Sequence, residues 1–254
     1  MRPLLVFLTA DSRAESPVAA GVAIELVHMA SLVHDDLIDG AELRRGRASV
    51  WSAYGPGAAQ AGGVYLFARA FAELAETGDG QAVAILADAA LALVRGEGME
   101  RNQRHRPDTT VDQYLTRCAL KTAKLFEAAC LLSSRRPELG EFGLSLGIAF
   151  QIVDDCLDCA GQTVETGKIA GTDLREGIPT LPLLLAAQED DLVRQALAGG
   201  SLEGALLRVA ATGAIEEARQ VARNYAEKAL ACLDGLEARD ELEAIAEAVV
   251  DRTA

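Results

Sequence analysis

Hydrophobic residues recur every three or four positions along almost the whole chain. This spacing is typical of amphipathic helices, and the alternation that indicates strands is nearly absent. The pattern predicts a short core helix at the N-terminus and a series of further helices. These are Val18–Ile38, Gly62–Glu76, Gln81–Val94, Thr110–Ser134, Leu139–Ala160, Leu181–Ala187, Asp191–Ala198, Leu202–Thr212, Ala214–Leu236 and Glu241–Arg252. We therefore expect an all-α fold.

One connection differs in kind from the short breaks between these helices. The segment Gly161–Thr180, GQTVETGKIAGTDLREGIPT, is long, polar and rich in glycine. A loop of this length inside a compact helical domain usually carries function. We expect the same here.

Composition narrows the class of protein further. Half of the 254 residues are hydrophobic but only 4% are aromatic, so the core must consist mainly of Ala, Leu and Val, which favours packed helices. The length allows one large helical domain as well as two small ones. A net charge of -14 argues against nucleic-acid binding. Acidic clusters can still bind phosphates through divalent cations.

The cysteines and the longest apolar runs indicate the cellular compartment of the protein. The five cysteines are odd in number and lie mostly in apolar helical sequence, which predicts small core residues of a reduced, cytoplasmic protein. The CxxC at Cys156 and Cys159 is a weak zinc or redox signal, because no second pair or nearby His accompanies it. No uninterrupted apolar stretch reaches the length that spans a bilayer, so we expect no stable membrane insertion.

Two aspartate clusters with the same spacing follow apolar helices. The first cluster (Asp35, Asp36 and Asp39) lies in ASLVHDDLIDGAELRRG, and the second cluster (Asp154, Asp155 and Asp158) lies in AFQIVDDCLD. Positions i and i+4 share a helix face, so the outer aspartates of each cluster can hold one ion together. Repulsion among the carboxylates and the helix dipole disfavour such clusters unless a cation such as Mg²⁺ offsets them.

A single cluster is as readily a solvated acidic helix end in a chain this acidic. The presence of two clusters, each preceded by an apolar helical segment, favours a pocket with metal-binding carboxylates on two opposite walls. Cationic and polar side chains fit the same interpretation, since Arg and Lys bind phosphates. They are Arg44, Arg45, Lys121, Thr122, Gln151 and Lys168. Such a site suits departure of pyrophosphate and formation of a carbocation in an apolar cavity.

These phrases resemble the trans-isoprenyl diphosphate synthases (polyprenyl synthetases), of the medium- or long-chain type. The matching phrases run in family order over most of the chain. They are ELVHMASLVHDDLIDGAELRRG, RGEGMERNQ as a weaker match, KTAKLFEAA, GLSLGIAFQIVDD and GKIAGTDLREGIPTLPLL. The resemblance implies a single all-α domain over residues 1–254, an orthogonal helix bundle around a central cavity, and a homodimer. It implies head-to-tail condensation of isopentenyl diphosphate with an allylic prenyl diphosphate.

The resemblance also implies roles for individual residues. Three Mg²⁺ ions would be held by Asp35, Asp39 and Asp154, with Asp36, Asp155 and Asp158 nearby. The catalytic set would be Asp35, Asp36, Asp39, Asp154, Lys121 and Lys168. Contacts to the allylic diphosphate would come from Arg44, Lys121, Thr122, Gln151 and Lys168. Contacts to isopentenyl diphosphate would come from Arg45, His28 and Arg2.

Two departures from the family pattern stand out. Of the family's N-terminal GGKRxRP motif only Arg2 and Pro3 remain, so the domain is expected to be N-terminally shortened and to lack one lysine of the isopentenyl diphosphate site. In GIPTLP, Ile178 takes a place often held by Lys. Two alternatives stay open: a class I terpene cyclase, and a non-catalytic partner subunit of a heteromeric synthase. The low aromatic content and the second aspartate cluster argue against the cyclase.

Small residues precede the first aspartate cluster by one helical turn. Ala30 and Ser31 would form the floor of the cavity into which the product grows, and a Phe or Tyr there would block extension. We therefore expect a product longer than farnesyl.

Overall fold

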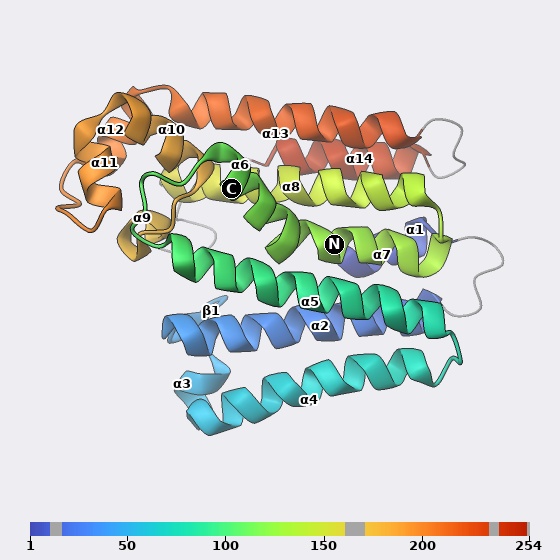
Figure 1. Ribbon diagram of the computed structural model, residues 1–254. Helices are drawn as coiled ribbons and strands as arrows, with labels where there is room; N and C mark the ends of the chain where they lie inside the picture. Colours follow the sequence, from blue (N-terminus) through green and yellow to red (C-terminus); the bar gives the residue numbers. More distant parts are fainter. Residues whose placement is uncertain (11–16, 161–170, 234–238, 253–254) are drawn as a thin grey trace.

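The computed structural model describes residues 1–10, 17–160, 171–233 and 239–252. These residues are almost entirely helical (Figure 1), which confirms the all-α prediction. The elements in chain order are α1 (Arg2–Leu8), α2 (Pro17–Asp39), β1 (Leu43–Arg44), β2 (Arg47–Ala48), α3 (Val50–Tyr54), α4 (Pro56–Ala75), α5 (Gly80–Gln103), α6 (Val111–Cys118), the π-helix η1 (Ala119–Ala123), α7 (Lys124–Ser134), α8 (Pro137–Ala160), α9 (Thr172–Glu176), α10 (Leu181–Glu189), α11 (Asp191–Leu197), α12 (Ala205–Ala211), α13 (Ala214–Leu230), the 3₁₀ turn η2 (Ala231–Leu233) and α14 (Arg239–Val250).

Polar residues at helix starts explain several boundaries. The Asp79 side chain accepts a hydrogen bond from the Ala82 amide at 2.9 Å and begins α5. Thr110 and Gln113 form a reciprocal capping box at the start of α6. Such caps satisfy amides that have no partner within the helix. The start of these helices is therefore encoded locally.

The structure differs from the predicted elements in several places, among them the unpredicted hairpin β1–β2 and helix α3 and the π-helix η1 inside the predicted helix Thr110–Ser134. Helix α4 begins at Pro56 rather than Gly62, because Gly55 adopts a φ of 85° that ends α3 and Pro56 fits the first turn of a new helix. Helix α5 continues past Val94 to Gln103 as its surface becomes polar. The short helix α9 lies inside the predicted loop Gly161–Thr180, of which residues 161–170 are outside the described part.

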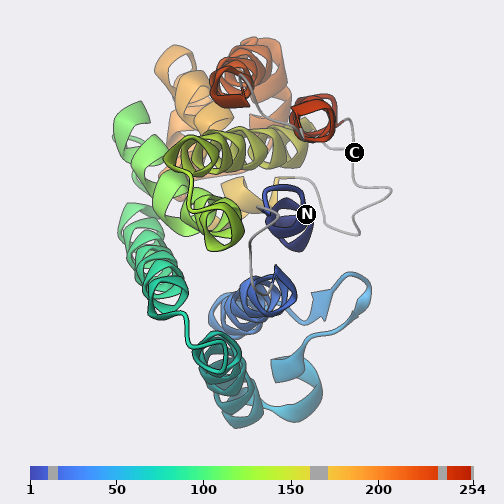
Figure 2. The same cartoon turned by 90° about the vertical axis from the view of Figure 1, so that its right-hand side faces the viewer.

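The helices pack in stacked rows around α8. Helix α8 contacts α7, α13, α10 and α14, while α2 packs along α4 and touches α1 and α7 (Figures 1 and 2). One buried apolar cluster joins α1, α2, α4, α5, α7 and α14 to the first half of α8. A second joins α6 and α10–α13 to its second half. Helix α8 thus connects the two cores and carries the second aspartate cluster in the half that belongs to the second core.

Glycines allow η1 to lie between α5 and α8. A Cβ on Gly96 of α5 would lie 2.5 Å from the Lys121 amide nitrogen, and one on Gly147 of α8 would lie 2.6 Å from Ala123 Cα. Gly143 likewise packs against the backbone of Phe126. Contacts this close exclude any larger side chain. The glycines of the GLSLGIAFQIVDD motif therefore let η1 and the start of α7 pack directly against α8, where Thr122 meets Gln151.

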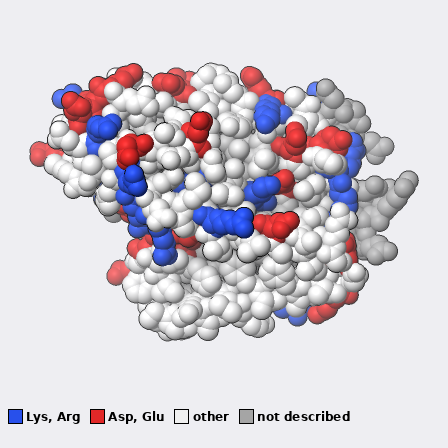
Figure 3. All heavy atoms as spheres, viewed as in Figure 1, with Lys and Arg blue, Asp and Glu red and all other residues white. Residues whose placement is uncertain are grey.

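Among the described residues, α2 alone is long and apolar enough to cross a membrane, with a mean hydropathy of 1.4. It packs lengthwise against α4 and also meets α1 and α7, which is the place of a core helix. All five cysteines are free thiols, and Cys232 is the one that is not buried. The face over α4 presents a largely uncharged surface in the view of Figure 3.

Candidate active site

A cavity of about 520 Å³ lies where α2, α5, η1 and α8 converge. Its lining includes most of the residues singled out from the sequence. These are Arg2, His28, Ser31, Asp35, Asp39, Arg44, Arg45, Lys121, Thr122, Gln151, Asp154 and Asp155. Ala30, Asp36 and Asp158 do not line it, and Lys168 lies outside the described residues. Residues far apart in the sequence thus meet in one pocket.

The first aspartate cluster divides into two roles. Asp35 and Asp39 line the cavity, as their i and i+4 spacing predicts. Asp36 is turned away and is 3% exposed, and its carboxylate accepts hydrogen bonds from Arg44 Nε at 2.8 and 2.9 Å and from Nη2 at 2.5 Å. Asp36 therefore holds Arg44 in place.

A tight hairpin after α2 places Arg44 and Arg45. Gly40, with a φ of 67°, ends α2, and the chain turns back through β1 and β2. Arg45 and Gly46 form the two-residue loop with positive φ values of 51° and 74°, the geometry that matches the twist of a two-stranded hairpin. The RRG sequence thus directs both arginines to the cavity rim.

The second aspartate cluster also divides. Asp154 and Asp155 line the cavity. Asp155 is 4% exposed and accepts hydrogen bonds from Tyr114 Oη at 2.6 Å and from Gln151 Nε2 at 2.8 Å. Burial raises the pKa of Asp155. Asp158 accepts the amides of Thr172 and Asp173, each at 3.1 Å, and so anchors the start of α9 to α8.

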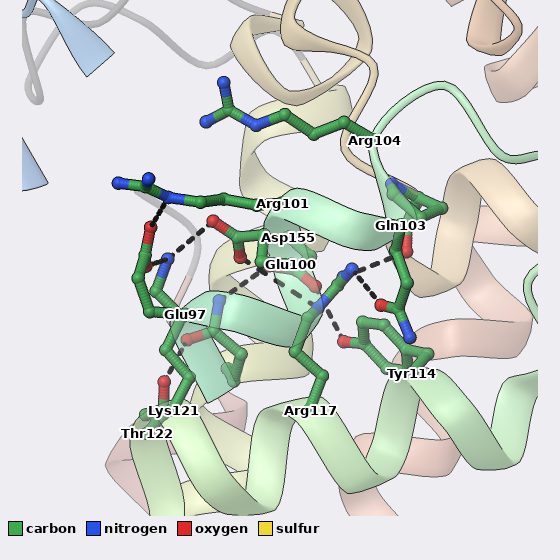
Figure 4. Close-up of polar contacts among 12 residues, drawn as sticks. Glu97, Glu100, Arg101, Gln103, Arg104, Tyr114, Arg117, Lys121, Thr122 and Asp155 are labelled. Carbon is green, nitrogen blue, oxygen red and sulfur yellow. Dashed lines mark hydrogen bonds and ion pairs between the residues drawn. The ribbon is translucent and has the colours of Figure 1, made fainter. Parts of the chain in front are cut away.

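The π-helix presents Lys121 and Thr122. Lys121 Nζ lies 2.8 Å from Glu97 and 2.5 Å from Glu100, as Figure 4 shows. Burial alone would lower the pKa of Lys121, but Glu100, Asp35 and Glu97 more than offset it, and the pKa is raised. Thr122 Oγ1 donates to Gln151 Oε1 at 2.7 Å. A π-turn often marks a functional site, and here it holds a permanently charged ammonium at the cavity.

A buried arginine, Arg117, links three of the segments that surround Lys121. Arg117 is 3% exposed, and its guanidinium donates to Gln103 Oε1 at 2.7 Å and to the Pro179 carbonyl at 3.0 Å (Figure 4). It also lies 3.9 Å from Glu100. A buried guanidinium needs such partners to offset its desolvation. Arg117 therefore fixes α6 against the end of α5 and the segment before α10.

The other predicted cluster combines Arg2, His28 and Arg45. The Arg2 guanidinium lies over the Phe126 ring at 4.6 Å, and burial lowers the pKa of Arg2 to about 10. Burial, together with the charges of Arg2 and Arg45, lowers the pKa of His28 to about 3. His28 is consequently a neutral side chain between cations.

Several lining residues were not predicted from the sequence. They are Leu32, Ala41, Leu93, Glu100, Arg117, Cys118, Thr172, Asp173, Glu176, Thr180 and Arg252. The weakly matching phrase RGEGMERNQ was the available signal for Glu100. Nothing in the sequence pointed to Arg252, which α14 delivers from the far end of the chain. Its Nη1 lies 2.9 Å from Asp154 Oδ1.

The donor set fits a hard divalent cation. Asp35, Asp39 and Asp154 offer carboxylate oxygens to the cavity. Burial raises the pKa of Asp35 to about 7; Lys121 opposes this rise, and Glu97, Asp39 and Glu100 add to it. A cation would offset the cost of the charged form. Within the described ranges no three His, Cys, Asp or Glu side chains form a ready-made metal cage, so an ion here would take further ligands from water or a phosphate.

Comparisons with known proteins agree with this site. The chain matches the family described as polyprenyl synthetase over residues 1–203. It is 39% identical to heptaprenyl diphosphate synthase component 2 of Geobacillus stearothermophilus, over 93% of this chain and 79% of that protein. It is 34% identical to octaprenyl diphosphate synthase of Escherichia coli, with the same shares covered.

The fold agrees equally well. The polyprenyl synthase of Caulobacter crescentus, crystallised with calcium and isoprenyl diphosphate, superposes with a TM-score of 0.92 at 34% identity, covering 100% of this chain and 84% of that one. The decaprenyl diphosphate synthase of Rhodobacter capsulatus gives 0.91 at 31% identity, covering 100% and 85%. Both the resemblance seen in the motifs and the predicted fold are confirmed: the chain belongs to the polyprenyl synthetase family of prenyltransferases.

Proposed function

We propose that this chain is a Mg²⁺-dependent polyprenyl diphosphate synthase that adds isopentenyl diphosphate head-to-tail to an allylic prenyl diphosphate. The observation that carries the proposal is the convergence of Asp35, Asp39 and Asp154 on a cavity that Lys121 and Arg44 also line. Opposed carboxylates and cations suit a metal-bound diphosphate. The resemblance implies three Mg²⁺ ions, with Asp155 and Asp158 as further candidates.

The reaction breaks one bond and makes one. The C1–O bond of the allylic diphosphate breaks with both electrons leaving on pyrophosphate, and the double bond of isopentenyl diphosphate supplies the electrons of the new 1′-4 C–C bond. A proton is then lost, for which released pyrophosphate is the proposed base. Mg²⁺, when bound, supplies the charge that stabilises the leaving pyrophosphate. Lys121 and Arg44 orient the leaving pyrophosphate. Leu93 and Phe150 give the cavity an apolar surface beside the allylic carbocation.

Arg2, His28 and Arg45 form the proposed site for isopentenyl diphosphate. Two guanidiniums can bind its phosphates, and His28 stays neutral between them because of its lowered pKa. A neutral imidazole donates or accepts a hydrogen bond without adding charge. Gln151, which lines the same cavity, accepts a hydrogen bond from Thr122 and donates one to Asp155.

We extend the proposal to product length and assembly. Ser31 lines the cavity with a small side chain, and the relatives include heptaprenyl, octaprenyl and solanesyl diphosphate synthases, so the product should exceed farnesyl diphosphate. Exposed apolar side chains on α4 and α5, namely Val64, Tyr65, Leu91 and Val94, suit packing against a second copy of the chain. The free cysteines suit a cytoplasmic enzyme. We treat residues 1–254 as one synthase domain.

The name of the Geobacillus relative, a component 2, favours a second arrangement in which this chain works with a different subunit. The measured mass of the purified chain in solution separates the two. A dimer that turns over alone supports the homodimer. A monomer that is inactive alone supports the heteromer.

The direct test is to incubate the chain with Mg²⁺, isopentenyl diphosphate and, in turn, geranyl, farnesyl and geranylgeranyl diphosphates. A ladder that ends at one prenyl diphosphate longer than farnesyl is expected. Asp35→Ala and Asp154→Ala should each abolish turnover with helicity intact, and retained turnover in either would contradict the metal assignment. A cyclic hydrocarbon product would instead indicate a cyclase.

A further inference from the structure

Two arginines outside the family motifs hold aspartates of the two clusters. Arg104 Nη2 lies 2.7 Å from Asp39 Oδ1. Arg252 Nη1 lies 2.9 Å from Asp154 Oδ1. Both aspartates line the cavity and belong to the proposed metal ligands. In each cluster, therefore, one carboxylate proposed to bind Mg²⁺ already forms an ion pair with an arginine.

Arg104 is placed by contacts at the end of α5. It is the residue that follows the helix, and the next amide, His105 N, donates to the Gly177 carbonyl at 2.7 Å at the end of α9. The Arg104 guanidinium also lies 3.7 Å from Glu176 on α9. The arginine therefore bridges α9 and the first aspartate cluster.

Arg252 is placed by the C-terminal helix. Leu242, Ala246 and Val249 bury one face of α14 in the core. Two residues after α14, the Arg252 guanidinium lies 5.0 Å from the centre of the Phe150 ring and lines the cavity. Its position is thus set by packing remote from the aspartates.

These two pairs differ from the pair formed by Asp36 and Arg44. The Asp36 side chain is 5% exposed and bound by two nitrogens of Arg44. The Asp39 and Asp154 side chains are 25% and 41% exposed, and the arginine contact to each is made by a single nitrogen, Arg104 Nη2 and Arg252 Nη1. Ion pairs whose two side chains are both open to solvent contribute little and break easily, whereas a bidentate pair on a buried carboxylate does not. The exchangeable pairs are the ones on the proposed metal ligands.

We propose that Arg104 and Arg252 act as counter-ions of Asp39 and Asp154, holding these carboxylates until Mg²⁺ arrives together with a diphosphate. A metal ion alone must displace a guanidinium from its closest carboxylate and brings no anion in exchange, although Arg104 keeps Glu176 at 3.7 Å. A metal ion that comes with a diphosphate brings the anion to which the displaced guanidinium can turn. The arginines therefore weaken binding of the metal alone and favour the metal–diphosphate complex. This inference rests on the proposed metal ligands.

Manganese binding to the full chain tests the proposal, with free Mn²⁺ followed by electron paramagnetic resonance. Arg104→Gln and Arg252→Gln should each tighten Mn²⁺ binding in the absence of any diphosphate by about two- to fivefold. With inorganic pyrophosphate present the gain should disappear or reverse. Arg106→Gln is the matched control, because the exposed Arg106 forms an ion pair with the exposed Asp108 and does not line the cavity.

Two further variants separate the failure of this inference from the failure of the proposed site. Asp39→Asn and Asp154→Asn should weaken Mn²⁺ binding. If they do so while both arginine variants bind Mn²⁺ as the wild type does, the counter-ion role is wrong. If neither aspartate variant changes Mn²⁺ binding, the metal assignment itself is wrong. Arg104→Lys and Arg252→Lys, which keep the charge, should stay near wild type, and a gain equal to that of the Gln variants would also overturn the role.

Discussion

Arg44 holds both carboxylate oxygens of Asp36, whereas the neighbouring Asp35 faces the cavity. One helical step of about 100° separates the two side chains. In the same motif, Asp36 therefore positions the guanidinium of Arg44, whereas Asp35 is available to a ligand in the cavity. Their substitution should have different consequences.

Asp36→Asn should destabilise the protein, and Asp35→Asn should not. The first removes a charge-assisted pair and leaves Arg44 loosely held, at a cost of about 1–3 kcal/mol in the free energy of unfolding. The second removes a carboxylate whose charged form burial disfavours, so stability in metal-free buffer should hold or rise while turnover is lost. Urea unfolding with a chelator and a turnover assay measure both. Equal destabilisation by the two variants would contradict the division of roles.

Gly96→Ala should displace the π-helix that carries Lys121. The added Cβ would lie 2.5 Å from the Lys121 amide nitrogen, so we expect a loss of about 1–3 kcal/mol in unfolding free energy and a marked fall in turnover. Gly98→Ala is the matched control two residues on, where a Cβ meets nothing within 4 Å. It should stabilise the protein by about 0.5–1 kcal/mol through helix propensity. If Gly96→Ala behaves like Gly98→Ala, the close contact does not position Lys121.

The sequence was sufficient for the fold and for the aspartate clusters because both are encoded locally. Helical periodicity identified α2 and α8, and the i and i+4 spacing put Asp35 and Asp39 on one face. The motif glycines mark close helix contacts that the structure shows at Gly143 and Gly147.

Residues placed by tertiary packing could not be predicted. Arg252 reaches Asp154 because α14 folds back on α8, and no pattern near either residue encodes that contact. Periodicity also ended α5 too early, because the apolar face of the helix gives way to Glu97 and Glu100, which face Lys121. The charged residues that the site needs at the end of α5 thus interrupt the apolar periodicity from which the helix end would have been predicted.

His28→Gln should reduce the loss of stability in mild acid. The pKa of His28 is lowered to about 3 in the folded protein, against about 6.5 in an unfolded chain. Below about pH 6.5 the unfolded chain binds a proton that the folded protein does not, so stability falls as the pH falls towards 3. Between pH 7.5 and 5.5 this one group should cost about 1 kcal/mol. Urea unfolding at both pH values measures the difference, and equal pH dependence in wild type and variant would show that His28 is not held neutral.

Ser31→Phe should shorten the product, and Ala30→Phe should act mainly on stability. Ser31 lines the cavity, so a phenyl ring there would occupy the space that the growing chain needs. Ala30 is fully buried and does not line the cavity, so the same ring would overpack the core at a cost of about 1–3 kcal/mol or more. Mass analysis of the product ladder and urea unfolding separate the two effects. Because the residues are adjacent, each variant is the control for the other. An unchanged ladder in folded Ser31→Phe would show that Ser31 is not the floor of the cavity.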